Sequence, residues 1–260
     1  MKVLFLHLPK TAGQSVHQYL IDLFTNEQVC PARVNEQYSQ LSDDELDRYT
    51  VYSGHVDWSR FDNLESPFFT FSILRDPLER LLSFYFYLRE QADLFEARGE
   101  LDSMPGVKAA KVNTPYEFFI CPNNPHRNFI DQTLDNLYTY YFAGRQYTAR
   151  NRLKDLVGAG NCFKSGEHLI RLAQMNIQKD VDAVYGIGSW KPKLQSDLQS
   201  RFGFEDIEKN TDYVINRGKT AGVDRLDLLR DLGGTDEVEE RVRQMCSLDY
   251  KLIEKLGLDI

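Results

Sequence analysis

A lysine and two hydroxyl side chains lie in a short loop near the start of the chain. The loop is residues 8–15, with the sequence LPKTAGQS, and it joins an apolar strand-like run to a helical pattern. Free backbone N–H groups at a helix N-terminus attract anions. Lys10 adds a positive charge, and Thr11 and Ser15 add hydroxyl donors. The loop alone is consistent with a phosphate-type site or with an ordinary strand-to-helix turn.

An arginine follows a second apolar run, at residues 74–83 with the sequence LRDPLERLLS. Its planar guanidinium suits a pair of phosphate oxygens, and Ser83 lies two helical turns further on. The alternative assigns Arg75 and Arg80 to surface salt bridges and Ser83 to a plain helix face. Asp76 is expected to cap the helix. Two cationic sites at the carboxyl ends of neighbouring strands favour a ligand site, because ligands of open α/β sheets bind there.

A histidine, His55, follows a short strand in residues 52–58, with the sequence YSGHVDW. An isolated histidine is more often structural than catalytic. Its expected place at the same edge of the sheet favours a general base, since imidazole titrates near neutral pH. His7, at the end of the first strand, is the competing candidate. We rank His55 first and expect His7 to be structural or to position another side chain.

Strand-like runs alternate with helical patterns along the chain, which predicts an α/β fold. We expect strands at residues 2–8, 50–54, 67–74 and 183–187. Helices are expected at 13–24, 42–49, from 76 towards 96, from 114, at 166–178, at 193–202, and as one final helix from 235 or 236 to 256. Residues 99–166 have the least regular pattern.

Composition narrows the class of protein. The chain has 260 residues, a formal net charge of −8 and 42% hydrophobic residues, which is ordinary for a globular chain. The acidic balance argues against a general nucleic-acid binder. No apolar stretch approaches the length of about 18 residues that spans a bilayer. With no signal peptide at the start, we expect a cytoplasmic protein without membrane contacts.

The four cysteines are far apart and form no Cys-x-x-Cys pair, so reduced thiols are expected rather than a metal or redox motif. They are Cys30, Cys121, Cys162 and Cys246. Two segments approach the nucleotide P-loop, residues 158–165 (GAGNCFKS) and 218–220 (GKT). Neither has both glycines of that motif, since Phe163 and Tyr213 stand at glycine positions.

Taken together, the three motifs resemble those of sulfotransferases that use 3′-phosphoadenosine 5′-phosphosulfate (PAPS). Residues 8–15 are similar to the His-x-Pro-Lys-Thr-Gly-Gly-Thr-Ser loop of that family, and residues 75–85 to its Arg-Asp-Pro-x-x-Arg-x-x-Ser-x-Tyr motif. Residues 53–56 (SGHV) resemble the uronyl 2-O-sulfotransferase branch. The resemblance is clear over residues 2–89 and fainter at 136–144, 169–188 and 216–220.

The resemblance implies transfer of a sulfuryl group from PAPS to a hydroxyl of a carbohydrate or other small acceptor, releasing 3′-phosphoadenosine 5′-phosphate (PAP). Arg75 and Ser83 would hold the 3′-phosphate, and His55 would be the general base. Lys10 would also meet the charge on the leaving phosphate, so no metal is required. The residues implied for the 5′-phosphosulfate are Lys10, Thr11, Ala12, Gly13, Gln14 and Ser15.

The sequence departs from the family pattern in several places. Ala12 replaces a loop glycine, so we expect a negative φ there. Residues 186–190 (GIGSW) lack a glutamate common in the family, and no Golgi anchor is seen, which favours a soluble bacterial relative. The charge of −8 suits a polyanionic acceptor poorly, and residues 138–147 are expected to pack rather than to stack on a sugar. A local basic wall could comprise Lys191, Lys193, Arg201, Lys209, Arg217 and Lys219.

These observations predict one domain over residues 1–260, a three-layer α/β sandwich with a mostly parallel central sheet and a P-loop-type, sulfotransferase-like nucleotide-binding core. Residues 1–100 would bind the donor. Residues 100–165 and the C-terminal third would shape the acceptor site. Two other functions stay open: an ATP-dependent small-molecule kinase, and a non-catalytic module for phosphorylated or sulfated ligands. The oligomeric state is not predicted.

Overall fold

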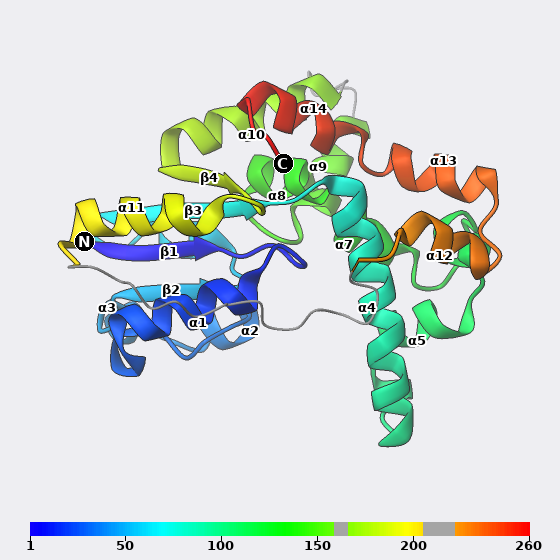
Figure 1. Cartoon of the computed structure of the whole chain (residues 1–260), viewed down its shortest axis with the longest axis horizontal. Coiled ribbons are helices and arrows are strands. Elements are labelled where there is room, and N and C mark those ends of the chain that lie inside the picture. Colours follow the sequence, from blue (N-terminus) through cyan, green and yellow to red (C-terminus); the bar gives the residue numbers. More distant parts are fainter. Residues whose placement is uncertain (159–165, 205–221) are drawn as a thin grey trace.

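Four parallel strands form the central sheet of the protein. The computed structural model describes residues 1–158, 166–204 and 222–260, without the side chains of 154–158. The strand order is β2-β1-β3-β4. The strands are β1 (Lys2–Leu6), β2 (Val51–Gly54), β3 (Phe68–Leu74) and β4 (Ala183–Gly186). The predicted positions of the strands and the parallel sheet are confirmed (Figure 1).

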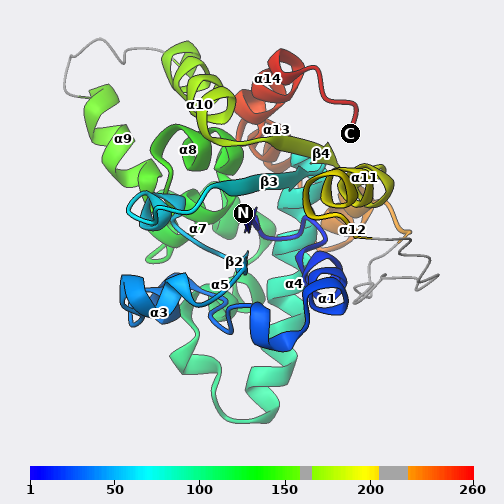
Figure 2. The same ribbon diagram turned by 90° about the vertical axis from the view of Figure 1, so that its left-hand side faces the viewer.

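Helices cover both faces of this sheet, as Figure 2 shows. On one face, Val3, Phe5 and Phe71 pack against α1 (Gly13–Phe24) and α11 (Trp190–Phe202). On the other face, Leu4 and Leu6 pack against α8 (Leu137–Gly144), α10 (Gly166–Asp180) and α14 (Ser247–Leu256). Alternate residues of each strand point to opposite faces, so both faces are apolar and buried. The predicted three-layer sandwich is confirmed.

Several helices begin where their capping residues predict. Ser42 and Thr114 form capping boxes with the glutamates three residues later, at the starts of α3 (Asp43–Asp47) and α6 (Pro115–Phe119). The carboxylate of Asp76 accepts from the Glu79 N–H at the start of α4 (Pro77–Ala97). In each case the signal that starts the helix comes from residues close together in the chain, which is why the sequence shows it.

The prediction of one long C-terminal helix is wrong, because the chain forms α13 (Asp236–Gln244) and α14 with a break between them. Asn136 lies at this break. Its backbone N–H donates to the Met245 carbonyl oxygen at 2.6 Å, and its side-chain oxygen accepts from the Leu248 N–H at 2.7 Å. These bonds to a distant residue replace the bonds that would continue the helix.

A second apolar cluster lies beyond the carboxyl ends of the strands, on the right in Figure 1. Helix α4 runs from the sheet into this cluster, where α6 and α13 pack with helices that the sequence did not predict. They are α5 (Pro105–Val112), α7 (Arg127–Leu134) and α12 (Arg225–Asp231). The short α2 (Asn35–Tyr38) and α9 (Ala149–Gly158) were also not predicted. None of the helices in the described ranges is long and apolar enough to cross a bilayer.

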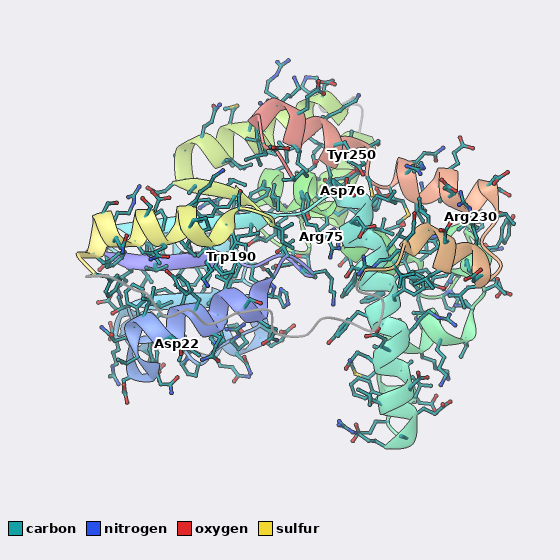
Figure 3. All side chains as sticks on the ribbon, in the orientation of Figure 1. Asp22, Arg75, Asp76, Trp190, Arg230 and Tyr250 are labelled. Carbon is teal, nitrogen blue, oxygen red and sulfur yellow. The ribbon has the colours of Figure 1, made fainter. Side chains whose placement is uncertain are left out.

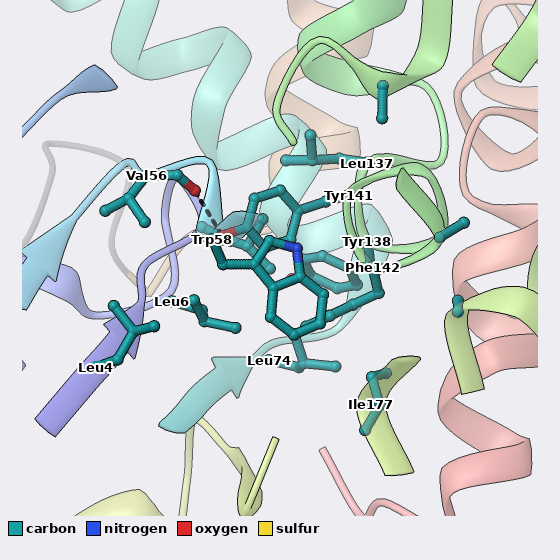
Figure 4. Close-up of a cluster of buried hydrophobic side chains, with 14 of the residues drawn as sticks. Leu4, Leu6, Val56, Trp58, Leu74, Leu137, Tyr138, Tyr141, Phe142 and Ile177 are labelled. Atoms are coloured by element: carbon teal, nitrogen blue, oxygen red, sulfur yellow. Dashed lines mark hydrogen bonds between the residues drawn. The ribbon is translucent and has the colours of Figure 1, made fainter. Parts of the chain in front are cut away.

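Residues 138–147, which contain four tyrosines, pack in the core, as expected. Tyr138 and Tyr141 are buried, and the Tyr141 hydroxyl donates to the Val56 carbonyl oxygen at 2.8 Å. Figure 4 shows this bond beside Trp58, whose ring stacks on Tyr141 with centroids 6.2 Å apart. The segment that follows His55 is thereby fixed to α8.

Residues 29–34 run alongside β2 and are joined to it by single bridges, Val29 to Val51 and Val34 to His55. The His55 N–H donates to the Arg33 carbonyl oxygen at 2.8 Å. A Cβ atom at Gly54 would lie 2.5 Å from that oxygen. The close approach of two backbone segments therefore requires glycine at position 54.

We expect Gly54→Ala to lower the free energy of unfolding by about 1–3 kcal/mol, because the added methyl group must push residues 29–34 away from β2. Urea denaturation of the purified protein measures this change. Gly188→Ala is the matched control, since no heavy atom lies within 4 Å of its added Cβ and its stability should change by less than about 0.5 kcal/mol. Equal stability of the two variants would contradict the prediction.

Candidate active site

The parallel pairing brings the predicted site residues to one edge of the sheet. At the end of β1, Leu6 lies opposite Gly54 of β2 and opposite Ser72 of β3. The residues that follow each strand therefore meet at the carboxyl edge. The rings of His7 and His55 stack there with centroids 4.3 Å apart, and Arg75 follows β3 on the other side of β1.

Two contacts fix the orientation of the His55 imidazole. Its Nδ1 lies 3.0 Å from the His7 carbonyl oxygen and 3.2 Å from the Tyr147 hydroxyl oxygen. The Tyr147 hydroxyl itself donates to the His7 carbonyl oxygen. Since a carbonyl oxygen can only accept, Nδ1 carries the proton and Nε2 keeps its lone pair. His55 thus has the tautomer that a base acting through Nε2 needs.

Burial lowers the pKa of His55 below its ordinary value. The positive charge of Arg33 lowers it further, whereas the hydrogen bond to the His7 carbonyl raises it. An imidazole with a lowered pKa is neutral at pH 7 and can accept a proton. Tyr147 and Arg33 were not predicted as site residues, because each reaches His55 only through the fold.

His7 positions its neighbours. Its ring is buried between Phe5 and His55, and burial places its pKa well below the ordinary value. A Cβ atom at Gly13 would lie 1.7 Å from His7 Nε2, so only glycine fits at the first residue of α1. The absence of a side chain at Gly13 therefore lets the backbone of α1 lie directly against the His7 ring. The structure supports the expectation that His7 positions other groups.

The loop between β1 and α1 contains two residues in the left-handed region, Lys10 with φ of 68° and Ala12 with φ of 64°. The expectation of a negative φ at Ala12 is wrong. The turn brings the Thr11 hydroxyl onto the Leu8 carbonyl oxygen at 2.8 Å, and the Ala12 carbonyl accepts the Val16 N–H in the first turn of α1. A non-glycine residue in this region costs roughly 1–2 kcal/mol.

Three cations gather on the β3 side of this loop. Arg75 donates to a Glu79 carboxylate oxygen at 2.9 Å, and Arg225 of α12 donates to the same oxygen at 2.6 Å. The Lys10 ammonium lies 4.3 Å from the centre of the Tyr87 ring. Burial lowers the pKa of Lys10, the Glu90 carboxylate raises it, and the charges of Arg75 and Arg225 lower it. The cluster forms a cationic site suited to anions.

One face of α4 carries the polar side chains of this site. Glu79, Ser83 and Tyr87 are spaced four residues apart and therefore share a face. Ser83 is buried on it. Figure 3 places Arg75 and Asp76 where β3 passes into α4, with Tyr250 of α14 next to Asp76. The Tyr250 hydroxyl donates to the Asp76 carboxylate at 2.8 Å, so the C-terminal helix braces this junction.

The alternative that assigned Arg80 to a surface salt bridge is wrong. Its side chain is fully buried and donates to the Thr133 and Leu134 carbonyl oxygens at the end of α7.

Of the residues in the loop between β1 and α1 and the first turn of α1, Thr11 and Ser15 are buried, whereas Gln14 is exposed.

Of the residues suggested for a basic wall, Lys191 and Lys193 lie in the first turn of α11, after the carboxyl end of β4. Arg201 pairs with Asp182 ahead of β4, at the opposite edge of the sheet. Lys209, Arg217, Lys219 and both near-P-loop segments fall largely outside the residues that the structure describes.

A cavity of about 560 Å³ lies at the amino edge of the sheet, away from His55. Trp58 and Phe68 line it, together with Asp62, Arg145 and Asp182. Arg145 pairs with Asp62 at 2.8 Å, and Asp182 accepts from the Thr70 N–H at 2.8 Å. Its charges are therefore satisfied within the protein.

A protein-family model described as "Sulfotransferase family" matches residues 1–254 of the chain. The match covers nearly the whole chain of 260 residues and includes every site residue described above. A search of curated proteins finds no match.

We expect Ala12→Gly to stabilise the protein by up to about 1 kcal/mol. Relief of the left-handed strain outweighs the added entropy of the unfolded chain, which is roughly 0.4–1 kcal/mol. Thermal and urea denaturation measure the gain. Ala97→Gly, at the exposed last turn of α4, is the control and should lose about 0.5–1 kcal/mol instead. A loss in both variants would refute the strain at Ala12.

Proposed function

The chain belongs to the sulfotransferase family, and on that premise we propose that it transfers a sulfuryl group from PAPS to a hydroxyl of a carbohydrate or other small acceptor. The observation that carries this proposal is the fixed tautomer of His55 beside a cationic cluster at the same sheet edge. A base and an anion site are the two groups that in-line sulfuryl transfer needs.

We assign the donor to the β3 side of the loop. Residues 10–15 would hold the 5′-phosphosulfate, through Lys10, the Ser15 hydroxyl and the backbone N–H groups at the N-terminus of α1, while the Thr11 hydroxyl holds the turn by donating to the Leu8 carbonyl oxygen. Arg75 and Ser83 would hold the 3′-phosphate, and Arg225 joins them because it shares Glu79 with Arg75. Three cations face two carboxylates here, so the cluster keeps a positive charge for an anionic nucleotide.

The proposed reaction uses His55 as base. Nε2 takes the proton of the acceptor hydroxyl as its oxygen forms a bond to sulfur, while the bond between sulfur and the leaving phosphate oxygen breaks. The Nδ1 bond to the His7 carbonyl stabilises the imidazolium that results. Lys10 balances the negative charge that the phosphate retains as PAP leaves.

We propose that residues 1–100 form the donor-binding part of a single domain. Of the segments expected to shape the acceptor site, residues 100–165 reach the same edge through Tyr147, while the C-terminal third also contributes Arg225 to the donor site. Their side chains would exclude water from the reacting groups and set specificity.

Calorimetric titration with PAP, in the absence of metal, tests the donor site. We expect wild type to bind PAP and Arg75→Ala to bind it about tenfold to a hundredfold more weakly, since a charge-assisted hydrogen bond is lost. Arg48→Ala, on the exposed end of α3, is the control and should bind normally. Binding of ATP with Mg²⁺ and not of PAP would support a kinase instead.

The pH dependence of turnover tests the base. We expect kcat/KM to fall as the pH falls through a value below about 6.5, because protonated His55 cannot accept the hydroxyl proton, and to be level above it. His55→Ala should lose about 10²–10⁴-fold in kcat and still bind PAP. His126→Ala is the control. Unchanged turnover in His55→Ala would rule out the base, and PAP binding without transfer to any acceptor would favour a binding module.

A further inference from the structure

Glu79 joins two arginines that come from distant parts of the chain. Its carboxylate oxygen Oε2 accepts from Arg75 Nη2 at 2.9 Å and from Arg225 Nη1 at 2.6 Å. Arg75 stands four residues before Glu79, whereas Arg225 stands 146 residues after it. The two guanidiniums therefore converge on a single oxygen atom, in the way that arginines gather around a phosphate oxygen.

The backbone of Glu79 is fixed by the start of α4. Its N–H donates to one carboxylate oxygen of Asp76 at 2.8 Å, and the other oxygen of that carboxylate accepts from the Tyr250 hydroxyl of α14. The Glu79 side chain is 39% exposed, so its carboxylate lies at the surface of the site and not in the core. The place of this carboxylate is thus set by the helix, and the arginines come to it.

The Arg225 side chain depends on this carboxylate. It is only 9% exposed, and within the described part of the chain its guanidinium donates to no residue other than Glu79. Its buried Nε has no hydrogen-bond partner there. Because a buried charge is costly unless it is paired, the bond to Glu79 is what keeps the Arg225 charge at this site.

The two arginines repel each other. Burial lowers the pKa of Arg75, the charge of Arg225 lowers it further, and the carboxylate of Glu79 raises it. Both arginine charges also lower the pKa of Lys10, after the effects of burial and of Glu90. Without an anion between them the two guanidiniums would move apart. Glu79 offsets this repulsion when no nucleotide is bound.

An ion pair between residues four apart at the start of a helix is often a stabilising surface contact and nothing more. Two features separate Glu79 from that case. Arg225 reaches the same oxygen from α12, a helix far along the chain. Ser83, which is expected at the 3′-phosphate, is buried one helical turn further along the same face of α4. The shared oxygen therefore lies on the face of α4 that would meet the nucleotide.

We propose that Glu79 is a positioning residue of the donor site, which holds Arg75 and Arg225 together so that both can bind the 3′-phosphate of the nucleotide. This rests on the proposed donor site and names the residue that assembles it. Each guanidinium has five N–H donors and gives one of them to Glu79, so donors remain for phosphate oxygens. Glu79 stays paired when the nucleotide binds and takes no part in the transfer itself.

Removal of the Glu79 carboxylate has opposite effects on nucleotide binding under the two roles. If the carboxylate only neutralises charge, its removal makes the site more positive and PAP binds more tightly. If it positions the arginines, the 3′-phosphate loses ordered donors and PAP binds more weakly, although the site has gained positive charge. The sign of the change in PAP affinity therefore separates positioning from neutralisation.

Calorimetric titration with PAP and with adenosine 5′-phosphate, which lacks the 3′-phosphate, measures this sign. We expect Glu79→Gln to bind PAP about tenfold more weakly than wild type and to bind adenosine 5′-phosphate equally well. Glu79→Asp keeps the charge on a side chain too short to span both arginines, and it should weaken PAP binding about threefold to fivefold. Glu65→Gln, which removes an exposed carboxylate with the same change in net charge, should match wild type for both nucleotides.

A double-mutant cycle shows whether Glu79 acts through the arginine pair. In a protein that carries Arg225→Ala, the further change Glu79→Gln should no longer weaken PAP binding, because there is no second guanidinium left to hold beside Arg75. Circular dichroism and thermal melting of each variant show whether its fold is intact.

Three results would overturn the inference while leaving the proposed function intact: unchanged or tighter PAP binding in Glu79→Gln, equal losses for PAP and adenosine 5′-phosphate, or an undiminished loss in the Arg225→Ala protein. If Glu79→Gln does not fold, unchanged PAP binding in Glu79→Asp has the same meaning. Failure of wild type to bind PAP would instead refute the proposed donor site itself.

Discussion

The placement of His7 is the constraint on which the rest of the site depends. Its ring lies between Phe5 and His55, and there is no room beside it for a side chain at Gly13. Its carbonyl oxygen accepts from both His55 and Tyr147. One buried residue therefore requires glycine at the first position of α1 and determines which nitrogen of His55 is free. Because its pKa is well below the ordinary value, His7 remains neutral and can stay buried.

The acidic protein concentrates positive charge at one edge of its sheet. Lys10, Arg75 and Arg225 contact α4, which follows β3, and Arg33 contacts Ser53 of β2. A net charge of −8 indicates little about such a site, because charges that are partly buried act locally while exposed ones are screened. Cations on both sides of the end of β1 make this edge suited to anionic ligands.

The C-terminal helices support this edge from a distance. Asp249 of α14 accepts from the N–H groups of Tyr138 and Thr139 at the start of α8, and from the Thr139 hydroxyl. Burial raises the pKa of Asp249 to about 6, and these three bonds offset part of that cost. Helix α8 then holds the segment after His55 through Tyr141. The segment after His55 is thus positioned by a residue almost 200 positions away in the chain.

Local signals determined a large part of this protein. Short apolar runs predicted the four strands, the capping residues Ser42, Asp76 and Thr114 predicted three helix starts, and motif spacing placed Lys10, His55 and Arg75 at one edge. These features depend on hydrogen bonds and side-chain periodicity within a few residues, so the sequence displays them directly.

Only the tertiary structure decided the remainder, because it depends on contacts between distant segments. The break before α14 follows from Asn136, the positive φ of Ala12 from the turn that seats α1 against His7, and the tautomer of His55 from a carbonyl oxygen 48 residues away. Arg33 and Arg225 carry no local motif. What each of these side chains can do depends on the residues that the fold places beside it. Periodicity and spacing in the sequence do not show which residues those are.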